Sequence, residues 1–185
     1  KIKIGVLGSG ATGKSLLVFR FINRQEMEVN QHEATIEDRY TTVELINGVN
    51  TTIELLDTAG DEEYQNLLDM WINYAEGFAL VFSIDNKQSF DALREKHDKI
   101  IRLKGYSVPM ILIGNKKDLN SKREVSVDDA KRLASSFRCE YFEISALNND
   151  GCKEPFLKLA DLIIANNNKQ KEKYIKILKQ ILAKK

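Results

Sequence analysis

The segment Gly8-Ser-Gly-Ala-Thr-Gly-Lys-Ser15 constrains the fold of this chain more than any other. It matches the pattern G-x-x-x-x-G-K-[ST] in full, and it lies between a short apolar run, Ile2 to Leu7, and apolar residues at helical spacing. Glycines in such a loop let successive backbone N–H groups point inward, and the following helix adds the positive end of its dipole. The segment therefore predicts a strand–loop–helix unit that binds phosphate groups.

Strand and helix patterns alternate along the rest of the chain, which predicts an α/β fold with a mostly parallel sheet. Alternating runs at 41–46 and 51–56 flank Asn47-Gly48, a dipeptide that favours a tight hairpin turn between antiparallel strands. The other expected elements are strands at 78–84, 108–114 and 140–144, and helices at 89–104, 126–137 and 153–166.

Length and composition fit one globular domain. The 185 residues are enough for a full core, and 43% hydrophobic with 30% charged residues is unlike a disordered chain. The formal net charge of +1 excludes a uniformly basic nucleic-acid coat, so we expect no nucleic-acid partner, and we expect a monomer. Cys139 and Cys152 lack metal-ligand spacing, and no apolar run approaches the roughly 20 residues of a membrane-spanning helix. Because the chain opens at Lys1 directly on an apolar strand, we expect it to be a trimmed form.

The glycine-rich loop assigns roles to its last two residues. Lys14 would reach the β- and γ-phosphates of a nucleotide, and the Ser15 hydroxyl would bind Mg²⁺. Read as an accidental glycine loop, the segment leaves the preceding strand, the lysine and the serine unexplained. The pattern does not choose between ATP and GTP. The expected nucleotide contacts are Gly8, Gly10, Ala11, Thr12, Gly13, Lys14, Ser15 and Leu16.

Two polar loops after later strands bear on the choice of base. Asn115-Lys-Lys-Asp118 and Ser145-Ala146-Leu147 each follow a predicted strand, so both emerge on the same sheet edge as the glycine-rich loop. The Asp118 carboxylate can accept from the N1–H and the amine that guanine presents side by side, and adenine has no such pair. Asn115 would tie this loop to the phosphate loop, the Lys116 stem would cover the base, and the Ala146 N–H would donate to guanine O6. Together the loops favour GTP, with ATP as the minority alternative.

These motifs make the chain resemble the Ras subfamily of small GTPases from about Ile2 to Asn166. The resemblance implies a P-loop NTPase G domain over residues 1–166, with a six-stranded, mostly parallel sheet and five surrounding helices. Its most specific match is Ala34-Thr-Ile-Glu-Asp-Arg-Tyr40, which resembles the family's effector segment. By this similarity Thr35 would bind Mg²⁺ through its hydroxyl and the γ-phosphate through its N–H, and Ile36 to Tyr40 would contact effector proteins.

A second motif, Asp57-Thr-Ala-Gly60, ends the third predicted strand and resembles the family's other metal motif. Asp57 would hold Mg²⁺ through a water, and the Gly60 N–H would sense the γ-phosphate, so loss of that phosphate would release both loops. The resemblance also implies GTP and GDP as ligands, an exchange factor and a GTPase-activating protein. The residues expected to act in hydrolysis are Lys14, Thr35, Gly60 and Asp61.

Three features depart from the family pattern. Asp61 stands where the family usually has a glutamine that orients the attacking water; an ionised carboxylate cannot donate to the phosphate, so we predict slow hydrolysis. Asp61 can also be read as an exposed aspartate without catalytic consequence. The segment from Asn23 to His32 is about two residues longer than usual and lacks the aromatic that stacks on guanine, so Met27 or Val29 would fill in and nucleotide release would be fast. Leu147 replaces a lysine near the base.

Residues 167–185 form a lysine-rich tail. It can continue the last helix and pack on the body, or form a basic amphipathic helix that rests on anionic lipid or in a partner's groove. No prenylation box is present, so either the chain has been cut or membrane binding relies on this tail. We expect a cytoplasmic protein, at the inner face of the plasma membrane or another cytosolic membrane surface. The apolar positions at helical spacing are Tyr174, Ile177, Leu178, Ile181 and Leu182.

The leading hypothesis is a Mg²⁺-dependent GTP/GDP switch, and two other function classes stay open. A guanine-nucleotide-binding module with little or no hydrolysis is favoured by Asp61 and opposed by the intact Thr35 and Gly60. A P-loop kinase is opposed by the effector-like segment and the base loops. Binding of ATP but not of GTP would favour the kinase.

Overall fold

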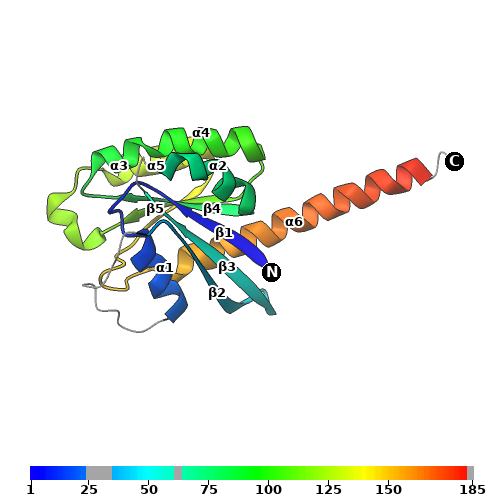
Figure 1. The fold of residues 1–185 in the computed structure, drawn as a ribbon, viewed down its shortest axis with the longest axis horizontal. Coiled ribbons are helices and arrows are strands. Elements are labelled where there is room, and N and C mark those ends of the chain that lie inside the picture. Colours follow the sequence, from blue (N-terminus) through cyan, green and yellow to red (C-terminus); the bar gives the residue numbers. More distant parts are fainter. Residues whose placement is uncertain (24–34, 61–63, 183–185) are drawn as a thin grey trace.

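A six-stranded sheet forms the centre of the molecule, with helices on both faces (Figure 1). The computed structural model describes residues 1–23, 35–60 and 64–182. The strand order is β2-β3-β1-β4-β5-β6, and all neighbours are parallel except the antiparallel pair β2 and β3. The strands are β1 (Ile2–Leu7), β2 (Glu37–Ile46), β3 (Val49–Thr58), β4 (Gly77–Ser83), β5 (Met110–Asn115) and β6 (Glu140–Glu143). The expectation of an α/β fold with a mostly parallel sheet is confirmed.

Six α-helices and one 3₁₀ segment are present in the described parts of the chain, where the resemblance implied five helices. The helices are α1 (Lys14–Asn23), α2 (Gln65–Tyr74), α3 (Lys87–Asp91), α4 (Leu93–Lys104), α5 (Val127–Phe137) and α6 (Lys153–Leu182), and the 3₁₀ segment is Lys117–Lys122. The helix expected at 89–104 is divided at Ala92, whose ψ of −15° lies outside the ideal α range. The Asn86 side chain accepts from the Ser89 N–H at 2.9 Å and starts α3 earlier than expected.

Two apolar cores lie on opposite faces of the sheet. In β4, Phe78 and Phe82 belong to the core beneath α2, α4 and α5, whereas Ala79 and Val81 belong to the core beneath α1 and α6. All residues of β4 are buried, as the continuous apolar run predicted. The sheet is therefore held on both faces, and the loops at the carboxyl ends of its parallel strands are fixed relative to one another.

The hairpin between β2 and β3 has the expected two-residue turn. Ile46 pairs with Val49, and Asn47 and Gly48 have φ values of 50° and 78°. Positive φ at both central positions defines a type I′ turn, whose twist matches that of the flanking strands. The hairpin places β2 at one edge of the sheet, and the last four residues of the effector-like segment, Glu37 to Tyr40, form the start of this strand.

Helix α6 continues well beyond the body of the molecule (Figure 1). Its first half packs on the sheet through buried residues that include Phe156 and Ile163. Residues 168–182 are exposed, so the tail continues the helix but does not pack on the body. None of the helices in the described ranges is long and apolar enough to cross a membrane.

Candidate functional site

At two positions in the loop between β1 and α1, the backbone leaves no room for a side chain. Gly13 has a φ of 85°, and a Cβ there would lie 2.4 Å from the Asn115 side-chain nitrogen. A Cβ at Gly8 would lie 2.1 Å from the Val81 carbonyl oxygen. Ala11 has a φ of 58°, a left-handed conformation that a Cβ disfavours. The sequence pattern of this loop therefore reflects close backbone packing as well as phosphate binding.

Lys14 and Thr12 both turn back onto the loop that carries them. Lys14 is 6% exposed, and its Nζ donates to the Ser9 carbonyl oxygen at 2.9 Å. The Thr12 hydroxyl donates to the same carbonyl oxygen at 3.0 Å. The charge of the lysine therefore lies at the loop, among the N–H groups at the start of α1, where a phosphate would be attracted.

Ser15 and Thr35 meet although 20 residues separate them. Their hydroxyl oxygens are 3.1 Å apart. In octahedral coordination with Mg–O distances of about 2.05 Å, neighbouring ligand oxygens lie about 2.9 Å apart, so this pair fits adjacent positions around Mg²⁺. Asp57 supplies a carboxylate that is 0% exposed at the end of β3. The donor set consists of hard oxygen ligands, as Mg²⁺ prefers.

Gly60 packs directly against the phosphate loop. A Cβ at Gly60 would lie 2.2 Å from the Gly10 nitrogen and 2.3 Å from the Ser9 carbonyl carbon, so no side chain fits there in this conformation. One residue earlier, the Ala59 N–H donates to the Ile36 carbonyl oxygen at 2.9 Å. The two segments expected to sense the γ-phosphate are thus connected to each other as well as to the loop.

Asn115 joins three loops at the carboxyl edge of the sheet. It is 1% exposed; its side-chain nitrogen donates to the Thr12 carbonyl oxygen at 2.8 Å, and its side-chain oxygen accepts from the Ala146 N–H at 3.0 Å. The Ala146 N–H, expected to donate to guanine O6, thus donates to Asn115 in this structure. Asp118 accepts from the Ser145 hydroxyl at 2.5 Å, and Lys116 adopts a left-handed φ of 64°. The structure therefore places both base loops next to the phosphate loop.

In a comparison with protein-family models, residues 3–165 match a model described as the Ras family. The chain belongs to the Ras family. Membership makes it a guanine-nucleotide-binding GTPase of the switch type, in agreement with the two loops beside the phosphate loop. The match ends before the exposed part of α6.

Several sequence-predicted residues of this Ras-family chain lie outside the described residues. Asp61 falls between the described ranges 35–60 and 64–182. Met27 and Val29, which were expected to pack against the guanine, fall between residues 23 and 35. Their roles therefore stay predictions from the sequence.

Arg20 of α1 contacts the second base loop, and no sequence motif identified this residue in the Ras-family chain. Its Nε donates to the Ala146 carbonyl oxygen at 3.0 Å, and one Nη donates to the Leu147 carbonyl oxygen at 3.2 Å. The guanidinium therefore holds the second base loop from the side of α1. Its position three residues before the end of an amphipathic helix gave no signal of this contact over more than 120 residues of sequence.

A second support for the base loops lies around β6. Arg123 forms two hydrogen bonds with the Glu143 carboxylate, at 2.9 and 2.7 Å, and the Tyr141 hydroxyl donates to the same carboxylate at 2.7 Å. Burial raises the pKa of Glu143, but the bonds from Arg123 and Tyr141 outweigh it, so the pKa lies below its ordinary value of 4.5. This cluster fixes the strand that leads into Ser145.

Neither cysteine is placed to act in the chemistry. Both are free thiols. Burial raises the pKa of the Cys139 thiol to about 12 and that of the Cys152 thiol to about 11. A thiol with such a pKa is almost entirely protonated at neutral pH and is a poor nucleophile.

Proposed function

We propose that the chain is a Mg²⁺-dependent GTP/GDP switch of the Ras subfamily that hydrolyses GTP slowly and signals in its GTP-bound form. The contact between the hydroxyls of Ser15 and Thr35 supports this proposal most strongly. It joins the phosphate loop to the effector-like segment through the two side chains that would hold the metal. A nucleotide whose γ-phosphate and metal occupy this junction would fix the segment, and its loss would release it.

The residues of the junction would stabilise the transferring phosphoryl group. Lys14 supplies positive charge, and the N–H groups of Thr35 and Gly60 supply hydrogen-bond donors. The metal, when bound, neutralises negative charge on the phosphate oxygens. Asp61 would accept a hydrogen bond from the attacking water but, when ionised, cannot donate to the phosphate as the family's usual glutamine does. Slow hydrolysis follows from that difference.

The nucleotide that co-purifies with the protein tests the proposal. It is released by denaturation and separated by anion exchange, and single-turnover hydrolysis is then measured on the wild type and on Asp61→Gln. Mostly GDP, with faster hydrolysis by Asp61→Gln, would support a slow GTPase. An unchanged rate in Asp61→Gln would contradict the role of Asp61.

The second candidate is a guanine-nucleotide-binding module with little or no hydrolysis. It is favoured by Asp61, which by the family resemblance would add negative charge beside the phosphates. Mostly GTP in the purified wild type, with no turnover over hours, would establish this candidate in place of the slow GTPase. Binding of ATP but not of guanine nucleotides would contradict both.

Effector proteins would bind at the edge of the sheet formed by β2. Ile36 is 51% exposed, and Asp38 and Arg39 are also exposed at the start of this edge strand. An edge strand offers unpaired backbone groups, so a partner can add a strand of its own. An exchange factor and a GTPase-activating protein would act on the same face; Gly10 leaves room for an arginine supplied by the latter.

The exposed end of α6 would place the protein on an anionic membrane surface facing the cytoplasm. Residues 1–168 contain 21 basic and 26 acidic residues, a net charge of −5, whereas residues 169–185 contain seven lysines and one glutamate, a net charge of +6. An anionic surface therefore attracts the tail and repels the body. The apolar side chains exposed along the tail include Tyr174, Ile177, Leu178, Ile181 and Leu182.

Flotation of the full chain with vesicles tests the membrane proposal. We expect binding to vesicles that contain phosphatidylserine at low salt, and weaker binding to neutral phosphatidylcholine vesicles or at high salt. Ile177→Gln with Ile181→Gln removes apolar area, and Lys173→Gln with Lys176→Gln removes charge; each pair should reduce binding. Lack of flotation at low salt, or self-association through the tail instead, would contradict the proposal.

A further inference from the structure

The two segments that flank the phosphate loop are connected by backbone bonds. The Ala59 N–H donates to the Ile36 carbonyl oxygen at 2.9 Å, and Glu37 pairs with Thr58 in the sheet. Ile36 directly follows Thr35, and Ala59 directly precedes Gly60. A displacement of Thr35 or of Gly60 therefore pulls on the other through a bond between their immediate neighbours.

A side-chain bond extends this connection to α2. The Trp71 Nε1–H donates to Glu37 Oε2 at 2.9 Å, and the indole is 3% exposed. Glu37 Oε1 accepts from Arg39 Nη2 at 2.7 Å and from Arg39 Nε at 3.0 Å. The Arg39 guanidinium in turn lies 4.5 Å from the centre of the Tyr74 ring, one turn further along α2. The first residue of β2 is thus held from α2 by two contacts.

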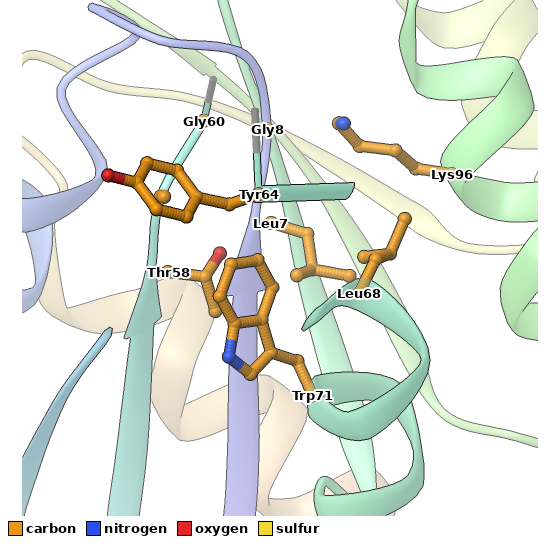
Figure 2. Close-up of a pocket in the computed structure, with 9 residues that line it drawn as sticks. Leu7, Gly8, Thr58, Gly60, Tyr64, Leu68, Trp71 and Lys96 are labelled. Atoms are coloured by element: carbon orange, nitrogen blue, oxygen red, sulfur yellow. The ribbon is translucent and has the colours of Figure 1, made fainter. Parts of the chain in front are cut away.

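The indole lines the same small cavity as the backbone of Gly60 (Figure 2). Trp71, Tyr64 and Leu68 of the α2 region line a small cavity together with Thr58 and Gly60. The volume of this cavity is about 10 Å³, so the indole has little room to move while α2 stays in place. A movement of α2 that follows Gly60 would carry the indole nitrogen away from Glu37.

We propose that Trp71 is a positioning residue that holds Glu37, and through it Thr35, in the conformation that accepts the γ-phosphate. The inference rests on the proposed GTP/GDP switch and names one device that couples its two sensing segments. The bond forms only when α2 and the start of β2 are both in the positions seen here. By linkage, the γ-phosphate strengthens the Trp71–Glu37 bond by the same factor by which that bond strengthens γ-phosphate binding.

Trp71 is the only tryptophan in the sequence, so its fluorescence reports on this bond directly. The first experiment compares the emission of the full chain loaded with GDP and with a non-hydrolysable GTP analogue. We expect the intensity or wavelength of emission, and its quenching by acrylamide, to differ between the two forms. In Glu37→Ala the difference should become much smaller. Identical emission and quenching in both forms of the wild type would overturn the inference.

The second experiment uses Trp71→Phe, which removes the N–H donor and keeps an aromatic ring. The dissociation constants of fluorescent GDP and of the GTP analogue are measured for each variant. We expect the affinity for the GTP analogue to fall about tenfold relative to the affinity for GDP. The variant loses a charge-assisted hydrogen bond that, by the proposal, is made only in the GTP-bound form. Equal weakening of both nucleotides, or of neither, would overturn the inference.

Tyr141→Phe is the matched control. It also removes an aromatic donor from a carboxylate that an arginine binds, but Tyr141 lies in β6, at the opposite edge of the sheet from β2, which follows Thr35. Any change should affect GDP and the GTP analogue equally. If the wild type binds no guanine nucleotide, the proposed function itself fails; if it binds both and Trp71 does not respond, only the coupling fails.

Discussion

Backbone conformation limits the side chain at two residues of the phosphate loop. Gly13 and Ala11 both have positive φ values, 85° and 58°, but only the first position carries the residue that adopts such values without strain. The pattern G-x-x-x-x-G-K-[ST] requires glycine at Gly13 and leaves Ala11 open. The sequence therefore predicted the conformation of one residue and not the strain in the other.

Replacing Ala11 by glycine should stabilise the domain. The left-handed conformation costs an alanine about 1–2 kcal/mol, and greater freedom of glycine in the unfolded chain offsets about 0.4–1 kcal/mol of that gain. We expect Ala11→Gly to raise Tm by about 1–3 °C with saturating GDP, measured by circular dichroism. Ala165→Gly, in an exposed turn of α6, is the control and should lower Tm. A lower Tm in Ala11→Gly would contradict the conclusion that the backbone at Ala11 is strained.

A methyl group at Gly60 should weaken the binding of GTP more than the binding of GDP. Its Cβ would lie 2.2 Å from the Gly10 nitrogen, so the segment would have to move away from the phosphate loop. We expect Gly60→Ala to lower the affinity for a non-hydrolysable GTP analogue by about tenfold or more relative to the affinity for GDP. Equilibrium titrations with fluorescent nucleotides measure both affinities. Gly48→Ala strains only the hairpin turn, where a Cβ meets nothing within 4 Å, and should leave the ratio of the two affinities unchanged. An unchanged ratio in Gly60→Ala would show that Gly60 does not sense the γ-phosphate.

Secondary-structure elements could be predicted where the signal is local. The Asn47-Gly48 hairpin and the buried strand β4 follow from turn chemistry and from an uninterrupted apolar run. The division of the 89–104 helix at Ala92 could not be predicted, because alanine favours a continuous helix. Contacts between distant elements, such as that of Trp71 with Glu37, depend on how a helix is positioned against the sheet. The sequence pattern does not specify that position.

Arg20 provides a test of contacts between elements. Its bonds to the carbonyl oxygens of Ala146 and Leu147 join α1 to the second base loop. We expect Arg20→Met to speed the dissociation of fluorescent GDP and of the GTP analogue alike, by about three- to tenfold, because the guanine is common to both. Arg132→Met removes an exposed i,i+3 pair on α5 and should leave both rates unchanged. Dissociation of GDP at the wild-type rate in Arg20→Met would contradict a role in holding the loop.

At the scale of the whole molecule, the sheet determines where the loops of the site meet. Side-chain clusters behind the loops stabilise that arrangement. The carboxyl ends of β1, β3, β5 and the region after β6 supply the phosphate loop, Asp57, Asn115 and Ser145. This convergence follows from a parallel sheet, and the sequence predicted it. The cluster of Arg123, Tyr141 and Glu143 behind the base loop has no motif, since Arg123 lies at least 18 residues before the two members in β6.

The pH dependence of stability tests this cluster. The pKa of Glu143 is lower in the folded chain than its ordinary value of 4.5, so the unfolded chain binds the proton more readily. The contribution of the ionised Glu143 carboxylate to the free energy of unfolding is therefore complete above about pH 4.5. It is lost as the pH falls through the lower, folded-state pKa. We expect Glu143→Gln to lower the free energy of unfolding by about 2 kcal/mol near neutral pH, with the deficit shrinking below about pH 4.5. Urea unfolding at a series of pH values measures both quantities.

The Glu143 carboxylate is surrounded by groups that keep their charge state over the acidic range of the test. Arg123, Tyr141 and Lys117 face its carboxylate, and none of them titrates between neutral pH and pH 3. Glu140→Gln, on the same strand, loses an exposed pair with Lys158 and should change stability by less than about 1 kcal/mol at any pH. A deficit in Glu143→Gln that stays constant down to about pH 3 would mean that packing, and not the charge of Glu143, accounts for its effect.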